Sequence, residues 1–152
     1  MRVALDSNIL AYLCGVSWCA EDDEKIARVR AIVRQLNETA SLIAPLQALG
    51  ELFVVLRRSK VDATEARQSV LEFTQTLGTV ASSERTMMAA LDLAVDHKLQ
   101  FWDSLIVTAA AEAGCTLLLS EDMQHGFVVR GMTVINPLAA KVHPKLKQLL
   151  AN

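Results

Sequence analysis

The fold is decided by the stretch Arg2-Val-Ala-Leu-Asp-Ser-Asn-Ile-Leu10, in which an apolar run stops at polar residues and then resumes. Residues 2–5 have the length and composition of a short buried strand, and residues 9–13 carry side chains suited to a helix. The polar residues between them are Asp6, Ser7 and Asn8. The stretch therefore predicts a strand, a polar switch and a helix.

The remainder of the chain repeats this alternation of short apolar runs with longer segments of helical periodicity. Further strands are predicted at residues 41–44, 79–81, 115–119 and 132–135. Helices are predicted at residues 25–36, 46–56, 62–77, 83–98 and 102–114. Strands separated mostly by helices indicate a parallel sheet covered on both faces. We therefore expect an α/β protein, a three-layer α/β/α sandwich with a central, mostly parallel sheet of four to five strands.

A length of 152 residues and a hydrophobic content of 52% suffice for one core without disulfides or a structural metal. No long linker or repeat divides the chain. We expect one domain over residues 1–140, with residues 141–152 as a C-terminal tail or helix of the same domain. The cysteines, Cys14, Cys19 and Cys115, are odd in number and form no Cys-x-x-Cys pair, which excludes a disulfide framework and a zinc ribbon.

The charge balance excludes proteins that coat nucleic acid with positive charge, because 15 Lys and Arg face 17 Asp and Glu and the net charge is -2. No apolar run reaches the roughly 18 residues that a membrane span needs. The N-terminal residues lack the apolar region and cleavage site of a secretory signal. The composition therefore predicts a cytoplasmic globular protein.

Four carboxylates lie at positions in the sequence that favour a ligand-binding role. Asp6 follows the first predicted strand, and Asp122 follows the strand at residues 115–119. Glu51 and Asp103 interrupt apolar helical stretches and have no cation three or four residues away. In a parallel sheet, ligands bind at the carboxyl ends of the strands. Buried carboxylates without partners must be protonated, paired at long range or held by a cation, and several together favour a divalent ion.

Each acid also has a structural explanation. Asp103 could be a helix N-cap, and Asp6 and Asp122 could be ordinary turn or capping residues. Glu51 could extend along the helix surface toward Arg57 or Arg58. The topology favours the metal site, because it can gather all four at one end of the sheet.

At these residues the chain resembles a known family. Val3-Ala-Leu-Asp-Ser-Asn-Ile-Leu10 resembles the first strand motif of PIN domains, and Gln47-Ala-Leu-Gly-Glu-Leu-Phe53 resembles the helix of their second acid. Asp103-Ser-Leu-Ile106 resembles their third acid, and Leu117-Leu-Leu-Ser-Glu-Asp122 their fourth. The order and spacing resemble the bacterial VapC-type toxins over essentially the whole chain, including the ending Gly131-Met-Thr-Val-Ile-Asn-Pro137.

The resemblance implies a Mg²⁺- or Mn²⁺-dependent ribonuclease, commonly the toxin of a type II toxin–antitoxin pair, with a small DNA-binding antitoxin and frequent homodimerisation. It implies Asp6 and Asp103 as the principal metal ligands, with Glu51 and Asp122 completing the catalytic acidic pocket. The polar residues expected to support this pocket are Ser7, Asn8, Ser120 and Glu121, the last as a reserve acid.

Substrate contacts are expected from cations near this pocket, and the candidates are Arg57, Arg58 and Lys60 at the end of the Glu51 helix. A solvated helix end explains them equally well. Aromatic residues are 5% of the chain, and their apolar contexts, including that of Trp102, favour a core or subunit interface over base stacking.

Other phosphate-handling families fit less well. A phosphatase of the haloacid dehalogenase type carries a second Asp two residues after the first, where this chain has Asn8. A phosphoacceptor receiver domain needs an acceptor Asp after its third strand, and it leaves Glu51 unexplained. A PIN scaffold that binds RNA or protein without cutting remains the alternative to a nuclease.

Overall fold

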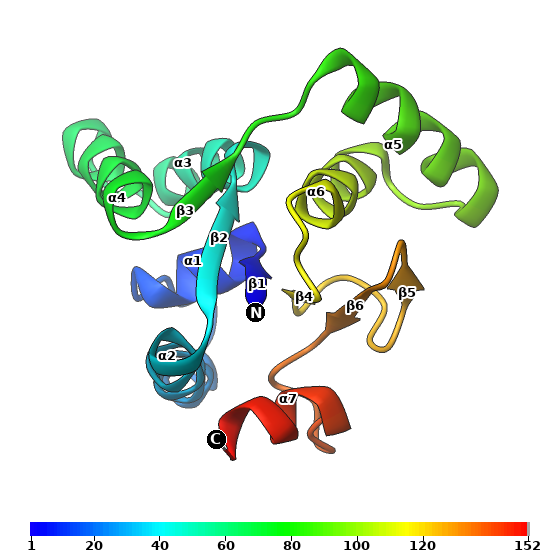
Figure 1. Ribbon diagram of the computed structural model, residues 1–152. Coiled ribbons are helices and arrows are strands. Elements are labelled where there is room, and N and C mark those ends of the chain that lie inside the picture. The colour runs from blue at the N-terminus through cyan, green and yellow to red at the C-terminus, as the bar shows by residue number, and fades with distance from the viewer. Residues whose placement is uncertain (152) are drawn as a thin grey trace.

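The structure, a computed structural model, describes residues 1–151 and shows alternating strands and helices along the chain (Figure 1). The strands are β1 (Arg2–Leu5), β2 (Ser41–Pro45), β3 (Gly78–Val80), β4 (Leu117–Leu119), β5 (Val128–Val129) and β6 (Met132–Ile135). The helices are α1 (Ser7–Leu13), α2 (Asp22–Thr39), α3 (Leu46–Arg58), α4 (Ala63–Thr76), α5 (Glu84–His97), α6 (Phe101–Glu112) and α7 (Pro144–Leu150).

The strands form one sheet in the order β3-β2-β1-β4-β6-β5, and all neighbouring pairs are parallel except β5 with β6. Helices α2 and α7 lie on one face of the sheet, and α5 and α6 lie on the other (Figure 1). The predicted three-layer α/β/α sandwich with a mostly parallel sheet is confirmed.

The predicted strand count of four to five was wrong, because the sheet has six strands. The additional strand, β5, pairs with β6 through a two-residue turn in which Arg130 and Gly131 both have positive φ, 49° and 80°. Such turns match the twist of a hairpin and usually carry Asn or Asp before Gly. Arginine at this position gives no sequence signal, and a two-residue strand shows no periodicity.

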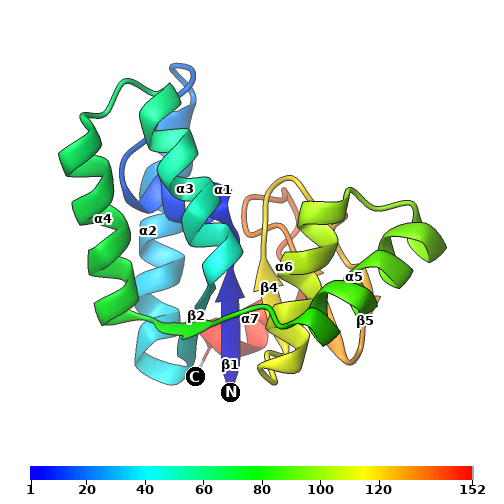
Figure 2. The ribbon, with the colours of Figure 1, turned by 90° about the horizontal axis from the view of Figure 1, so that it is seen from above.

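The chain changes direction across the sheet between β1 and β4, which is the feature that positions a ligand site. From β1 it moves to β2 and β3 on one side, and it then returns to β4 on the other side. β1 and β4 run side by side and end together, with Leu5 paired to Leu119 (Figure 2). In open α/β sheets a crevice forms at the carboxyl ends of the strands at such a switch point.

The core explains why α6 is apolar nearly all round. The helix is buried continuously from Ser104 to Ala110, with the sheet on one side and α5 packed along it. The preceding helix, α5, is fixed at its start by a capping box between Ser83 and Thr86. Thr86 also donates a hydrogen bond to Glu112 at 2.6 Å, which joins the start of α5 to the end of α6.

The final helix, α7, buries Leu146 and Leu149 in the common core. Within residues 1–151, no helix combines the length and the apolar composition needed to cross a membrane.

Candidate active site

Asp6 is the most deeply buried acid at the carboxyl end of the sheet, with 3% of its surface exposed. It directly follows β1 and is the N-cap of α1, and its N–H donates to the carbonyl oxygen of Leu119 at 3.0 Å, which ties it to β4. Its Oδ1 accepts the N–H of Ser7 at 2.7 Å, and its Oδ2 accepts the hydroxyl of Ser120 at 2.7 Å. The carboxylate is therefore held by Ser7 at the start of α1 and by Ser120 directly after β4.

Asn8 joins Asp6 to the loop that carries Asp122. Its amide nitrogen lies 3.1 Å from Oδ2 of Asp6 and 3.3 Å from Oδ2 of Asp122. Its amide oxygen accepts the N–H of Glu121 at 3.1 Å. One side chain from α1 thus fixes the loop after β4 against the end of β1.

Glu51 reaches the same place from the middle of α3. Its Oε2 accepts the hydroxyl of Ser7 at 3.1 Å, and Ser7 Oγ also lies 3.5 Å from Oδ1 of Asp6. Its Oε1 accepts the amide nitrogen of Gln47, one helical turn earlier, at 3.2 Å. These contacts hold Glu51 toward Asp6, so the structural explanation by Arg57 or Arg58 does not apply.

Asp103 is the third residue of α6 and is half-buried. The N-cap of this helix is Gln100, whose Oε1 accepts the N–H of Asp103 at 2.9 Å. The explanation of Asp103 as an N-cap is therefore wrong. Its carboxylate is free to interact with the other acids across the end of the sheet.

Electrostatics shows that the four carboxylates share one environment. The pKa of Asp6 is raised to about 6, chiefly by burial; hydrogen bonds from Ser120 and Ser7 act against this rise, and the charges of Asp103 and Glu51 contribute to it. The pKa of Asp103 is raised by burial and by the charges of Glu51 and Asp122. Among residues 1–151, no ion pair engages any of these acids.

The side chain of Glu121 points to a different set of partners. Its Oε1 accepts the hydroxyl of Tyr12 at 3.2 Å and lies 3.1 Å from Nζ of Lys25. The structure therefore does not bring this carboxylate, the reserve acid of the sequence interpretation, to the other four. Only its backbone N–H supports the site, through Asn8.

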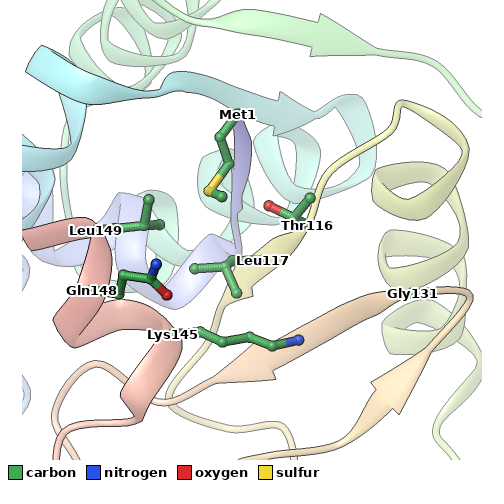
Figure 3. A pocket seen from close by; sticks show the side chains of 7 residues that line it. All are labelled: Met1, Thr116, Leu117, Gly131, Lys145, Gln148 and Leu149. Carbon is green, nitrogen blue, oxygen red and sulfur yellow. The ribbon is translucent and has the colours of Figure 1, made fainter.

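Two cavities flank the acids. A cavity of about 510 Å³ between α3 and α6 includes Ser7, Glu51 and Arg58 in its wall, and one of about 150 Å³ includes Asp103 and Asp122. Gln100 lines both. A third cavity of about 350 Å³ lies at the amino ends of β1 and β4 and contains none of the four acids (Figure 3). The residues lining it are Met1, Thr116, Leu117, Gly131, Lys145, Gln148 and Leu149.

Of the three expected substrate cations, only Arg58 lies beside the acids, in the wall of the larger cavity. Arg57 donates to the carbonyl oxygen of Val61 at 2.9 Å, and Lys60 lies beyond the end of α3. The sequence interpretation missed Trp102, which is 48% exposed and lines this cavity, so it is not a core residue. It also missed Gln47 and Gln100. Gln47 precedes Glu51 by four residues and Gln100 precedes Asp103 by three, and this spacing could have indicated a contact between each pair.

As the side chains stand, no three His, Cys, Asp or Glu residues within 1–151 are close enough to form a direct metal-ligand cluster. The donor chemistry nevertheless fits a hard divalent cation. Mg²⁺ keeps several of its waters and takes only one or two carboxylates directly, while further carboxylates bind those waters. The four carboxylates have no ion pair among residues 1–151, and neighbouring negative charges raise the pKa values of Asp6 and Asp103, which is compatible with a hydrated ion between them.

The buried charge of Asp6 predicts that the metal-free protein loses stability as pH rises. Because the pKa of Asp6 is about 6 in the folded protein and its ordinary value is 3.8, the folded state binds the proton more tightly than the unfolded state does. Unfolding free energy should therefore fall by about 1 kcal/mol between pH 5 and pH 8 from this group alone. Urea titration in chelator should show this fall in the wild type and a smaller one in Asp6→Asn. Equal pH dependence in the two proteins would contradict the assignment.

The chain matches a known protein family. The PIN domain family model matches residues 3–126, a range that contains all four acids. No curated protein sequence is similar enough to this chain to count as a match.

Several solved structures share the fold at low sequence identity. A toxin–antitoxin complex from Klebsiella pneumoniae matches with a TM-score of 0.62 at 16% identity, covering 89% of this chain and 97% of the other. VapBC2 from Rickettsia felis, bound to a DNA fragment from its promoter, gives 0.62 at 16% identity, covering 80% and 89%. VapC20 from Mycobacterium tuberculosis, a Sarcin-Ricin loop cleaving toxin, gives 0.60 at 15% identity, covering 76% and 86%.

The family model covers most of the chain, and the structural neighbours share its sheet and helical layers. The chain belongs to the PIN domain family.

Proposed function

We propose that this protein is a metal-dependent endoribonuclease that hydrolyses RNA phosphodiester bonds, and that it is the toxin of a type II toxin–antitoxin pair. One observation carries the nuclease proposal: at the switch point of the sheet, the charges of Asp103 and Glu51 reach buried Asp6, and no ion pair among residues 1–151 offsets the charge of these acids. Burying such charges uncompensated costs several kcal/mol, so the arrangement favours a bound cation.

The expected cofactor is Mg²⁺, with Mn²⁺ as a substitute, since both accept oxygen ligands. Asp6 and Asp103 would bind the ion, and Glu51 and Asp122 would complete the acidic pocket. A bound divalent ion supplies positive charge against the scissile phosphate and makes a water molecule more acidic.

The protein's own residues perform the remaining work. Ser120 and Asn8 hold the Asp6 carboxylate in one orientation, which removes the need to order it when the ion arrives. Glu51, fixed between Ser7 and Gln47, can accept a proton from the attacking water or orient it. Asp122 is exposed, so it can do the same from the opposite side of the acid cluster.

Positive charge for the RNA backbone would come first from Arg58, whose position beside Glu51 allows it to reach a phosphate neighbouring the cleaved one. Arg57 and Lys60 would extend this contact along the exposed end of α3. This local supply explains how a chain with a net charge of -2 could bind RNA.

The partners proposed are a small DNA-binding antitoxin and a second copy of the chain, in the cytoplasm. Structural neighbours include toxin–antitoxin complexes. Helix α5 exposes Met88, Leu91 and Val95 at spacings of three and four residues, and Val95 is 78% exposed. An apolar stripe of this kind is typical of an interaction surface. Light scattering of the purified protein would give the oligomeric state.

Incubation of the purified protein with a mixed RNA pool tests the nuclease proposal. We expect cleavage with Mg²⁺ or Mn²⁺, none with excess chelator, and recovery when Mg²⁺ is added back. Cleavage that persists in chelator would contradict the metal-dependent mechanism. The absence of cleavage under every metal condition would favour the alternative, a PIN scaffold that binds RNA or protein without cutting.

A further inference from the structure

The larger cavity beside the acids combines an aromatic surface with polar side chains and one cation. Trp102, at the second position of α6, forms part of its wall, and Val54 and Val55 of α3 add apolar surface. Gln47, Gln100 and Arg58 supply the polar groups. Sites that bind planar ligands typically have mostly apolar walls with a few polar groups that fix orientation.

Trp102 lines this cavity and remains 48% exposed, so part of its indole is accessible to a ligand. Phe101 packs against it edge-to-face, with ring centroids 4.9 Å apart at 66°, and so steadies the indole from one side. A partly exposed, sterically supported indole can stack on a base of any identity, because every base has a π-face.

The cavity is directly continuous with the acid cluster. Ser7 and Glu51 belong to its wall, and Ser7 contacts both Glu51 and Asp6. Arg58 lies on the same wall, and no ion pair within residues 1–151 engages its guanidinium. A nucleotide whose phosphate approached the acids would therefore meet an aromatic ring and an available cation in the adjoining space.

We propose that this cavity is a nucleobase-binding subsite for single-stranded RNA, in which Trp102 stacks on the base next to the cleaved bond and Arg58 contacts the adjoining phosphate. Gln47 and Gln100 are placed to meet the base edge. This inference rests on the proposed ribonuclease function and adds to it a requirement for an unpaired base. An unstacked base is accessible in single strands and loops, whereas a duplex keeps its bases inside the helix.

A protein partner is the competing occupant of this region. A separate cavity of about 310 Å³ lies next to Trp102 toward α5, and its lining includes Ser82, Ser83 and Glu84 beside Met87, Phe101, Trp102 and Leu105. Glu51, Arg58 and both glutamines are not part of this lining. The position of Arg58 and of the acid cluster on the α3 side therefore favours RNA there.

Steady-state cleavage of a single-stranded RNA tests the subsite in the intact protein. Trp102→Ala should raise KM about tenfold, as expected for loss of one stacked base, while kcat stays close to that of the wild type. Trp102→Phe should restore most of the affinity. Unchanged KM in Trp102→Ala would overturn the proposal, as would a changed oligomeric state with unchanged RNA affinity.

Tryptophan fluorescence tests binding independently of cleavage. Trp18→Phe leaves Trp102 as the only tryptophan, and Trp102→Phe leaves Trp18, which packs against Tyr12 and does not line the cavity, as the matched control. Both are titrated with a single-stranded oligoribonucleotide in Ca²⁺, with a gel to confirm that the RNA stays intact. Quenching only in the protein that retains Trp102 supports the subsite.

The two measurements separate failure of the subsite from failure of the nuclease proposal. Cleavage by the wild type without quenching of Trp102 would overturn the subsite alone. Quenching of Trp102 by RNA in a protein that never cleaves would support the subsite and contradict the nuclease.

Discussion

Replacement of Asp6 by asparagine should lower the rate of RNA cleavage by about a thousandfold or more. The substitution keeps the size of the side chain and removes the buried charge that would bind the ion. Loss of about 4 kcal/mol of transition-state stabilisation corresponds to this factor, and a metal site contributes several kcal/mol. The measurement is the cleavage rate at saturating Mg²⁺ on the RNA that the wild type cuts best.

Unfolding should not account for this loss. An asparagine oxygen can still accept the N–H of Ser7, and the variant no longer buries a negative charge beside Asp103 and Glu51. The new amide nitrogen cannot accept the hydrogen bonds that Asn8 and Ser120 donate to Oδ2 of Asp6, which offsets part of the gain. Asp96→Asn, at an exposed position on α5, is the matched control and should cleave like the wild type. A fully active Asp6→Asn protein would refute the proposed site.

The sequence was sufficient to predict most of the fold because the layers follow from local patterns. β1 and β2 are apolar runs ended by Asp6 and by the helix after Pro45, and these signals do not depend on distant parts of the chain. The six-stranded sheet was not predicted because β5 depends on its pairing with β6 rather than on its own two residues. Its turn uses Arg130 where the common pattern has Asn or Asp.

The four acids could be proposed from the sequence because each interrupts an apolar pattern or follows a strand. Their hydrogen-bond partners could not be predicted, because the direction in which a side chain points depends on the tertiary structure. Glu121 and Asp122 are adjacent in sequence, yet Glu121 turns to Lys25 while Asp122 lies beside Asn8. The exposure of Trp102 could not be predicted for the same reason, since its apolar neighbours in sequence occupy the buried side of α6.

Asp103→Asn should remove both cleavage and the stabilisation that Mg²⁺ gives to the wild type. A ligand that binds only the folded state stabilises it by about 2.7 kcal/mol at a hundred times its dissociation constant. For a chain of this size, that energy corresponds to a rise in Tm of roughly 5–10 °C. Differential scanning fluorimetry with increasing Mg²⁺ or Mn²⁺ should show this rise in the wild type and little of it in the variant.

The metal-free stability of Asp103→Asn separates loss of the ion from loss of the fold. Burial and the charges of Glu51 and Asp122 raise the pKa of Asp103, so its ionised form is disfavoured in the empty site. In chelator at pH 8 the variant should therefore unfold at the same temperature as the wild type or slightly above it. Because Asp6 and Asp103 would act on one ion, the double variant should cleave no more slowly than either single variant. If the rate losses of the two single variants multiplied in the double variant, the two carboxylates would not share a metal. A rise in Tm with Mg²⁺ in Asp103→Asn equal to that of the wild type would show the same.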